Sequence, residues 1–393
     1  MAIDPGGALG WSFLSAAYLK RSKEIDSTID AQKAEAAARR SLALRRTGNV
    51  GAALRLVQAL MQQHRFSDAL IAAKEAVAIL PGYGPCLESE SEVLFELGRY
   101  DESRKIFKDN IARMSDPPGL ALEARFLVLD GKNDQALEVL NKARVQMDAN
   151  LNVPRESAAW FDEKYGEALL YEGHLAEGKA ALNDALTLYP RDYKAYAALT
   201  RFFAGQGDWR AVIEYGHKSN SIAQMVDIEA LVGDAYVQLG NKAKAAECYQ
   251  TVERVAGRPS GGSASLHDFT AAAVAHGHAL DRQYAIYCAD HGVNLDAAYG
   301  AALRDIQARR DIYAFDTLAW VCFKRGELHE AQLAIGKALA YGTKDPKLFF
   351  HAGMIASKSR DKAKSREYLA EALATKSALD ALQSAEARAE IGA

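Results

Sequence analysis

Five histidine and cysteine side chains gather in one stretch of the sequence and are the first candidates for chemistry. They are His267, His276, His278, Cys288 and His291. Imidazole nitrogen and thiolate sulfur are ligands that zinc prefers in proteins. Residues two apart, such as His276 and His278, face different directions on a helix, and the stretch has no second close ligand pair. We therefore expect ordinary polar and core residues and no bound metal here, and we keep a metal site in the 267–291 region as the less favoured alternative.

Motifs for enzyme chemistry are absent from the sequence. It contains no nucleophile elbow, no phosphate-binding loop and no HExxH pair. The Gly261–Gly262 pair is not followed by the lysine and hydroxyl residue of a phosphate loop. We expect no enzyme activity, no catalytic residue and no cofactor.

Glutamates with helical spacing are the sharpest positive feature. Glu88, Glu92 and Glu96 are spaced by four, so they share one face of a helix, and Glu163 and Glu167 repeat the pattern further on. Like charges one turn apart weaken a helix slightly, so folding does not require them. We expect an acidic stripe on a groove wall that binds Lys or Arg of a partner. The alternative is a solvated face without a ligand.

Other side chains at equivalent helix positions complete the predicted groove. Positive charges interrupt the acidic stripe, and aromatic surface follows toward the C-terminal half. A lysine and an asparagine one turn apart, which would hold a terminal carboxylate, do not occur among these positions. The predicted partner-binding residues besides the five glutamates are Arg125, Tyr171, Lys194, Arg201, Asp316, Trp320, Phe323 and Phe350.

The elements that position these side chains are helices arranged as repeated hairpins. Apolar and small residues at 315, 318, 319 and 322 fall on one helix face, and a second stripe follows the break at Gly326–Glu327. The same arrangement recurs from Phe315 to Phe349 and from Ala338 to Ala372, an offset of roughly 34 residues, which is the length of a tetratricopeptide repeat. The pattern predicts an all-α chain without strands.

The repeat pattern extends over nearly the whole chain. We expect roughly nine to ten hairpins, each stacking on its neighbours because one hairpin cannot bury both of its faces. Small residues such as Gly166, Gly233 and Gly353 should let helices approach closely. The expected parts are an N-terminal array at 9–255, a flexible linker at 256–265, a C-terminal array at 266–376 and a capping helix or tail at 377–393.

Composition limits the classes of function. The 393 residues include 48 basic and 51 acidic side chains, for a net charge of −3, which argues against a general nucleic-acid binder. No apolar run is long enough to span a membrane. The start of the sequence does not read as a signal peptide, so we expect a soluble protein, either cytoplasmic or, if an export signal was removed, periplasmic. The four cysteines lie in different hairpins, so we expect free thiols.

Several short motifs carry a resemblance to a known family. They are the Leu-Tyr-Pro ending at Leu188–Pro190, the Asp-Trp pair Asp208–Trp209, and the segments Tyr287–Gly292, Asp316–Trp320 and Phe349–Ala356. With the 34-residue period, they resemble an uncharacterised subgroup of bacterial tetratricopeptide-repeat proteins, many of them exported. The resemblance covers residues 9–376. It implies a right-handed α-solenoid whose concave groove binds proteins or peptides, and it implies no enzyme activity.

The function that follows is a non-enzymatic scaffold that binds a protein or peptide partner in its groove. A preformed helical surface limits the ordering cost of such binding. The competing hypothesis is an assembly factor that associates with itself through the ends of the solenoid. The oligomeric state and the partner are open at this point.

Overall fold

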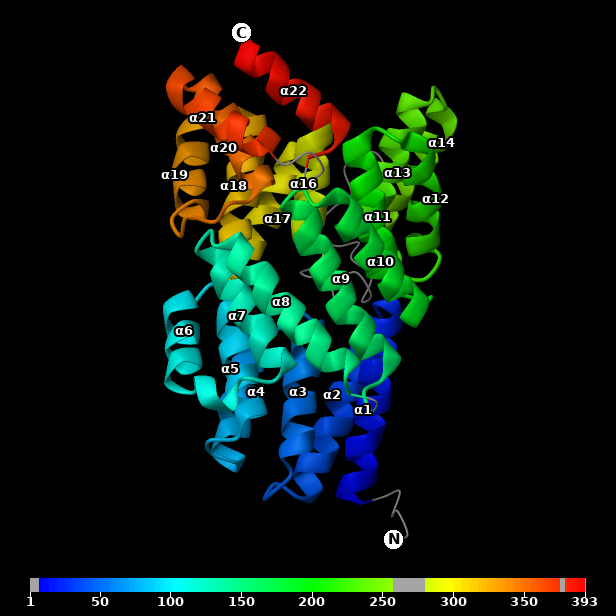
Figure 1. Cartoon of the computed structure of the whole chain (residues 1–393), viewed down its shortest axis with the longest axis vertical. Coiled ribbons are helices and arrows are strands. Elements are labelled where there is room, and N and C mark those ends of the chain that lie inside the picture. The colour runs from blue at the N-terminus through cyan, green and yellow to red at the C-terminus, as the bar shows by residue number, and fades with distance from the viewer. Residues whose placement is uncertain (1–6, 151, 257–279, 375–378, 393) are drawn as a thin grey trace. The chain divides into compact units, whose positions relative to one another are not determined.

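A computed structural model describes residues 7–150, 152–256, 280–374 and 379–392, and in these ranges the chain is all-α (Figure 1). The prediction of an all-α fold is confirmed. Consecutive helices pair as antiparallel hairpins, and we call the two members of each pair the first and the second helix. The described elements through residue 148 are α1 (Ala8–Ile25), α2 (Thr28–Leu44), α3 (Val50–Gln62), α4 (Phe66–Ile79), α5 (Gly84–Glu96), α6 (Tyr100–Asp109), the 3-10 helix η1 (Ile111–Arg113), α7 (Pro117–Leu129) and α8 (Asn133–Asp148). The remaining ones are α9 (Arg155–Tyr171), α10 (Leu175–Leu188), α11 (Tyr193–Gln206), α12 (Trp209–Asn220), α13 (Val226–Gln238), α14 (Lys242–Val255), α16 (Asp281–His291), α17 (Leu295–Ala308), α18 (Ile312–Arg325), α19 (Leu328–Ala338), α20 (Pro346–Lys358), α21 (Lys362–Ala374) and α22 (Ala381–Gly392).

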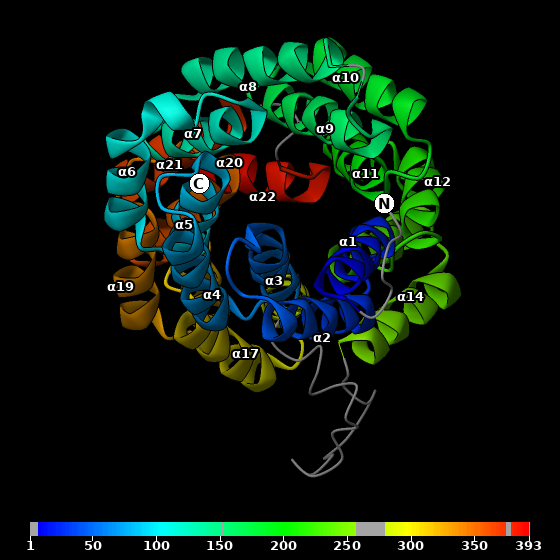
Figure 2. The same cartoon turned by 90° about the horizontal axis from the view of Figure 1, so that it is seen from below.

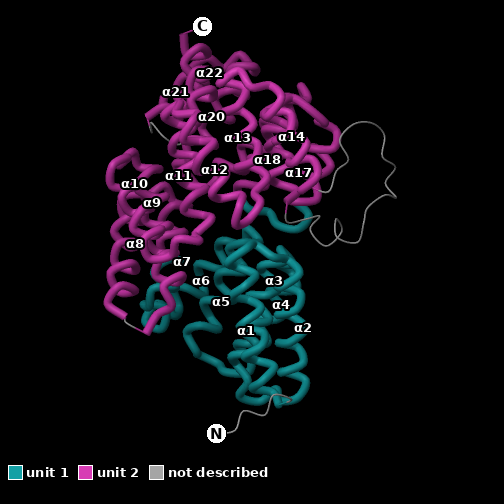
Figure 3. The backbone as a smooth tube through the Cα atoms, turned by 90° about the vertical axis from the view of Figure 1, so that its right-hand side faces the viewer, with its two compact units in different colours: residues 1–122, 306–311 teal, residues 123–305, 312–393 magenta. Residues whose placement is uncertain are grey.

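The chain divides into two compact units (Figure 3). Unit 1 comprises residues 1–122 with 306–311, and unit 2 comprises residues 123–305 with 312–393. The predicted linker at 256–265 falls almost wholly outside the described residues. The helices that flank it in the described chain, α14 and α16, belong to the same unit.

Glycine ends several of the first helices, for a conformational reason. Gly173 and Gly240 follow α9 and α13 with φ values of 82° and 77°, in the left-handed region that other residues rarely adopt. A Cβ at either position would meet nothing within 4 Å, so space does not select glycine there. Glycine is favoured there by the backbone conformation of the turn between the two helices.

Other glycines are required by close packing, as the sequence pattern predicts. A Cβ on Gly166 would lie 2.9 Å from Leu182 Cγ, and one on Gly353 would lie 2.6 Å from Leu369 Cγ. Real Cβ atoms do not approach carbon this closely. The prediction that small residues let paired helices approach is confirmed at these sites.

Unit 2 contains a contact between segments that are far apart in the sequence. The Thr343 hydroxyl donates to the carbonyl oxygen of Leu129 at 2.8 Å, across 214 positions of the chain. Beside it, a Cβ on Gly131 would lie 2.4 Å from the Gly342 carbonyl oxygen. The loop that enters α20 is thereby held against the turn between α7 and α8.

Within unit 2 the second helices form an outer layer. Helices α8, α10, α12, α14 and α19 lie outside α9, α11 and α20, and α22 lies inside again (Figure 2). We call the faces of the first helices α9, α11, α13, α16, α18 and α20 that point away from the second helices the inner face of unit 2. The pairwise packing of these first helices along the chain makes that face continuous.

Unit 1 includes its own contact with a distant segment. The Arg310 N–H donates to the Leu97 carbonyl oxygen at 3.1 Å, and the Arg309 guanidinium lies 5.3 Å from the centre of the Phe66 ring. Residues 306–311 therefore pack on the turns that end α3 and α5.

Three further expectations bear on chemistry. Cys86, Cys248, Cys288 and Cys322 are all free and buried, which confirms the prediction of free thiols. Among the described residues, none of the helices combines the length and the hydropathy that a membrane span requires. Residues 266–279 of the expected C-terminal array lie outside the described residues.

Candidate functional site

Five ionisable side chains form a connected chain across three first helices of unit 2. Lys164 Nζ lies 3.0 Å from Glu163 Oε1 and 2.7 Å from Glu167 Oε2. Arg201 lies 3.8 Å from Glu167 and 2.7 Å from Asp227. We call these five residues the charged network. Because it joins α9, α11 and α13, it spans three successive hairpins.

Local sequence positions these side chains. Glu163 and Glu167 are one helical turn apart on α9, and Lys164 precedes Glu167 by three, a spacing at which opposite charges meet. The Asp192 carboxylate accepts from the N–H groups of Lys194 and Ala195, which caps α11 and fixes the helix that carries Arg201.

Burial divides the network into one hidden group and four accessible ones. The Glu163 side chain is 1% exposed, whereas those of Lys164, Glu167, Arg201 and Asp227 are 27–42% exposed. An ion pair with this exposure is only modestly stabilising, since water competes for both charges. The four outer groups can therefore exchange partners with a ligand at low cost.

The charge states of the network follow from this division. Burial raises the pKa of Glu163 to about 8, so this carboxyl is protonated at neutral pH. Burial also opposes ionisation of Glu167, but Lys164, the protonated Glu163 and Arg201 together lower its pKa to about 2. Burial likewise opposes the charges of Lys164 and Arg201, while the facing carboxylates raise the pKa of each. The accessible part presents two cations and two carboxylates.

Tyr171 lies at the C-terminal end of α9, one turn after Glu167. Its side chain is 46% exposed. The charge of Asp345, followed by burial, raises the pKa of Tyr171, so the hydroxyl stays neutral. Asp345 caps α20 by accepting from the N–H groups of Lys347 and Leu348. Tyr171 therefore adds an aromatic, hydrogen-bonding surface beside the charged network.

Arg125 and Lys194 lie outside the charged network. Arg125 is partly buried on α7. The Lys194 ammonium lies 5.7 Å from the centre of the neighbouring Tyr193 ring, near the start of α11. Of the predicted residues in unit 2, the structure brings Glu163, Glu167 and Arg201 together.

The expected acidic stripe on α5 of unit 1 is weaker in charge than the sequence suggests. Burial raises the pKa of Glu88 to about 8, and the carboxylates of Asp116 and Glu92 add to the rise, so Glu88 is protonated at neutral pH. Glu96 lies 3.8 Å from the Arg309 guanidinium. Glu92 is exposed. Spacing by four places the three side chains on one face, but one is neutral and another faces a cation.

The prediction of an aromatic surface on α18 and α20 is wrong for Trp320 and Phe350. Trp320 is 1% exposed and Phe350 is fully buried, both within one apolar cluster of unit 2. Phe323 is partly buried and stacks on Trp320, with ring centres 5.1 Å apart. Large rings at these first-helix positions fill the space between adjacent hairpins, so they serve the core.

Asp316 is likewise a buried structural residue. Its carboxylate lies 2.8 Å from His351 Nδ1, and the His351 ring stacks on Trp320 at 4.2 Å. The Trp320 indole N–H donates to Asp290 at 2.7 Å. Asp290 is exposed, and we call the other three residues, Asp316, Trp320 and His351, the buried polar chain.

The candidate metal region contains paired side chains instead. His291 Nε2 lies 2.8 Å from Asp234, and His291 Nδ1 lies 2.8 Å from the Tyr287 carbonyl oxygen. Cys288 is fully buried. No group of His, Cys, Asp and Glu that could hold a metal occurs among the residues that the structure describes. His267, His276 and His278 lie outside that part of the chain.

The sequence analysis missed two members of the charged network, Lys164 and Asp227. Lys164 directly follows the predicted residue Glu163, and Asp227 lies on α13, the first helix of the next hairpin after that of Arg201. The i, i+3 spacing of Lys164 and Glu167 would have indicated Lys164. No local signal indicates Asp227, because its pairing with Arg201 spans 26 positions and depends on how the hairpins stack.

Comparison with known proteins agrees with the geometry of the hairpins. A sequence profile described as tetratricopeptide repeat matches residues 230–257, which cover most of α13 and α14. A search of curated proteins found no match. The hairpin formed by α13 and α14 is therefore similar to a tetratricopeptide repeat.

Solved structures of helical-repeat proteins resemble parts of the chain. PilW, a type IV pilus biogenesis factor, is 16% identical, with a TM-score of 0.44 over 53% of this chain and 94% of its own. A tetratricopeptide-repeat protein from Parabacteroides merdae is 16% identical, with a TM-score of 0.35 over 70% and 99%. The human IFIT1 dimer with PPP-AAAA is 16% identical, with a TM-score of 0.49 over 80% and 69%.

Proposed function

We propose that this protein is a non-enzymatic scaffold that binds a peptide or protein partner on the inner face of unit 2. The observation that carries the proposal is the charged network, which places accessible charges of both signs on three successive first helices. The similarity of its hairpins to tetratricopeptide repeats supports an interaction role. Binding on preformed helices avoids the cost of ordering the site.

The chemistry of the network favours a partner segment that carries both an acidic and a basic side chain. A carboxylate from the partner would replace Asp227 on Arg201, and an ammonium or guanidinium would pair with Glu167. Exposed pairs exchange at low cost because water already competes for them. Such contacts fix the register of a bound segment and speed association more than they raise affinity.

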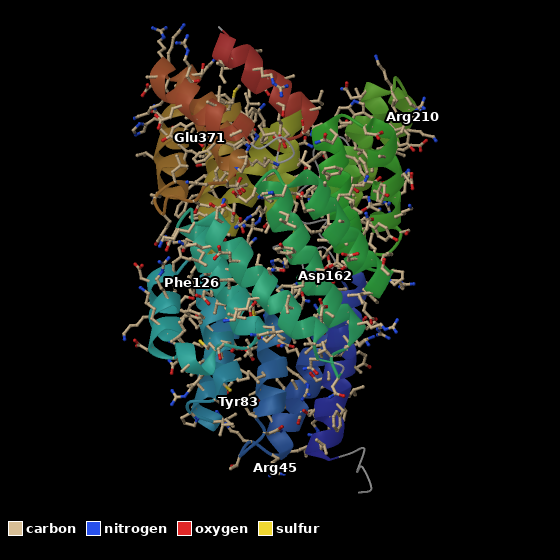
Figure 4. The ribbon with its side chains drawn as sticks, viewed as in Figure 1. Arg45, Tyr83, Phe126, Asp162, Arg210 and Glu371 are labelled. Atoms are coloured by element: carbon tan, nitrogen blue, oxygen red, sulfur yellow. The ribbon has the colours of Figure 1, made fainter. Side chains whose placement is uncertain are left out.

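The experiment is affinity capture of partners from the source organism with three versions of the full chain. Arg201→Gln removes the central cation, and Arg210→Gln on α12, an exposed residue of a second helix, is the matched control (Figure 4). Both variants lose one positive charge. We expect the wild type and Arg210→Gln to retain the same partners, and Arg201→Gln to lose them at least fivefold. Equal capture by all three would contradict a role for the network.

A second candidate function, self-association, is supported by α1. This helix buries Ser12 and Ser15 while Leu9 and Phe13 are 60% and 52% exposed. An apolar face at the first helix of an array suits contact with a second copy. Sedimentation of the wild type and of Phe13→Gln tests this candidate, since an oligomer that depends on α1 would dissociate in the variant. A wild-type monomer at all concentrations would exclude it.

A further inference from the structure

Helix α22 contacts more of unit 2 than an end cap requires. It packs on α20 and α21, the last hairpin, and also on α11. Helices α11 and α20 belong to hairpins that three other hairpins of the described chain separate. Figure 2 shows α22 inside the outer layer, between α11 and α20. The expected capping role explains the contacts with the last hairpin but not those with α11.

The apolar contacts of this segment are few and specific. Leu379 is 1% exposed and Ala387 is fully buried, and both belong to the apolar cluster that contains Phe350 and Met354 of α20. Ile391 packs on the same cluster. At the other end of α22, the Ala381 Cβ lies 3.6 Å from the position that a Cβ on Gly207 would occupy. Gly207 directly follows α11. Because Ala387 is fully buried, a larger residue at 387 would have to displace its neighbours.

Polar contacts fix the direction of the helix. Asp380 accepts from the N–H groups of Leu382 and Gln383 at 2.8 Å and so caps the N-terminus of α22. Burial raises the pKa of Asp380, and the charge of Lys347 on α20 opposes the rise. Near the other end, the Ser357 hydroxyl of α20 donates to Glu390.

The rest of α22 is poorly buried. Leu382 is 43% exposed, and Ala385 and Ala389 are exposed as well. An isolated helix of this length is marginal in water, so its order depends on these contacts. A tethered segment needs little intrinsic affinity to stay bound, because its effective concentration is on the order of millimolar. A free helix with the same contacts and a better fit can therefore displace it.

We propose that the surface between α11 and α20 is a docking site for a short alanine-rich amphipathic helix of a partner protein, which α22 fills in this chain. The partner helix has apolar side chains at the positions of Leu379 and Ile391, a small one at that of Ala387, and carboxylates at those of Asp380 and Glu390. This inference rests on the proposed function, because it names the class of partner that the inner face of unit 2 binds.

The experiment uses the full chain and a labelled synthetic peptide of residues 379–392. Ala387→Glu places a charge at a fully buried position and should release α22, whereas Ala389→Glu, two positions away and exposed, is the matched control. Hydrogen exchange should rise at least tenfold over 381–392 in Ala387→Glu only. The peptide should bind Ala387→Glu at least tenfold more tightly than the wild type or Ala389→Glu. A peptide that itself carries Ala387→Glu should not bind.

Two results would overturn the inference. One is equal binding of the peptide to the wild type and to Ala387→Glu, or no binding to a folded Ala387→Glu chain whose α22 exchanges freely. The other is unchanged protection of 381–392 in the double variant Leu379→Asp, Ala387→Glu, since the buried contacts would then not hold the helix.

Partner capture separates this inference from the proposed function. If Arg201→Gln loses partners while Ala387→Glu captures no more than Ala389→Glu, the inner face binds partners but α22 does not compete with them. If Ala387→Glu captures more, the competition is supported. If none of the variants differs from the wild type, the proposed function itself fails.

Discussion

The first helices of unit 2 carry two polar clusters that lie at similar places in the hairpins and differ in access to water. The charged network on α9, α11 and α13 leaves four of its five groups at least partly exposed, whereas Asp316, Trp320 and His351 of the buried polar chain are buried. Long flexible side chains reach past the helix surface, while rings pack between hairpins. The same repeat position can therefore serve binding in one hairpin and the core in another.

The largest effect should come from the sealed cluster. Trp320→Ala removes a fully buried ring and leaves Asp290 without the indole N–H. We therefore expect the free energy of unfolding to fall by ~3–5 kcal/mol. Tyr171→Ala, an aromatic truncation beside the charged network, should cost less than ~1 kcal/mol because the ring is exposed. Chemical denaturation measures both. Similar losses of unfolding free energy in the two variants would contradict the difference in burial between the two clusters.

Packing beside the buried polar chain can be tested with a single methyl group. Gly353→Ala on α20 forces a Cβ to within 2.6 Å of Leu369 Cγ, so we expect destabilisation by ~1–3 kcal/mol. Gly336→Ala on α19 meets nothing within 4 Å and should stabilise the helix by ~0.5–1 kcal/mol. Thermal unfolding of the two variants should move in opposite directions. A neutral Gly353→Ala would mean that the helices separate freely at this point.

The hidden group of the charged network predicts a dependence on pH. The folded-state pKa of Glu163, about 8, lies above its usual 4.5, so its contribution to stability is complete below pH 4.5 and is lost as the pH rises toward 8. Glu163→Gln mimics the protonated form and removes this loss. We expect the variant to gain on the order of 1–3 kcal/mol over the wild type between pH 5 and pH 8.5.

Glu167 provides an internal check, because its pKa is lowered and it therefore titrates in a different pH range from Glu163. Its contribution to stability is present above pH 4.5 and is lost as the pH falls toward 2. The difference between wild type and Glu163→Gln at pH 5 and pH 8.5 therefore reports on Glu163, because Glu88, which titrates in the same range, is common to both chains. A constant difference between wild type and Glu163→Gln across this range would show that Glu163 is ionised in the folded protein.

The smallest effect on partner binding is expected in unit 1. Replacing Glu88, Glu92 and Glu96 together by Gln should leave helix content intact. The free energy of unfolding should rise at neutral pH, because Gln at 88 mimics the protonated carboxyl that burial favours in the folded chain, and the lost contact between Glu96 and Arg309 should offset part of the rise. Partner capture and its salt dependence should fall less than with Arg201→Gln. If the triple variant loses partners more strongly, the acidic stripe is the principal binding surface and the charged network is secondary.

The hairpins and their glycines could be predicted from the sequence because their causes are local. Helical periodicity, the turn at Gly173 and the small residue at Gly353 each depend on neighbours within one hairpin. The burial of Trp320 and Phe350 was not predictable from spacing alone, since a first-helix position looks the same whether the next hairpin covers it or not. The pairing of Arg201 with Asp227 and the docking of α22 on α11 depend on how hairpins stack, which no short window contains.

The central claim is that partners bind the inner face of unit 2, and site-specific photo-crosslinking tests it most directly. A photoreactive phenylalanine would replace Tyr171 beside the charged network or, as the control, Leu333 on α19, a second-helix residue that is 57% exposed. After irradiation in extracts of the source organism, we predict discrete adducts from position 171 that Arg201→Gln abolishes, and none from position 333. Adducts from 333 alone, or adducts from 171 that persist in Arg201→Gln, would contradict the claim.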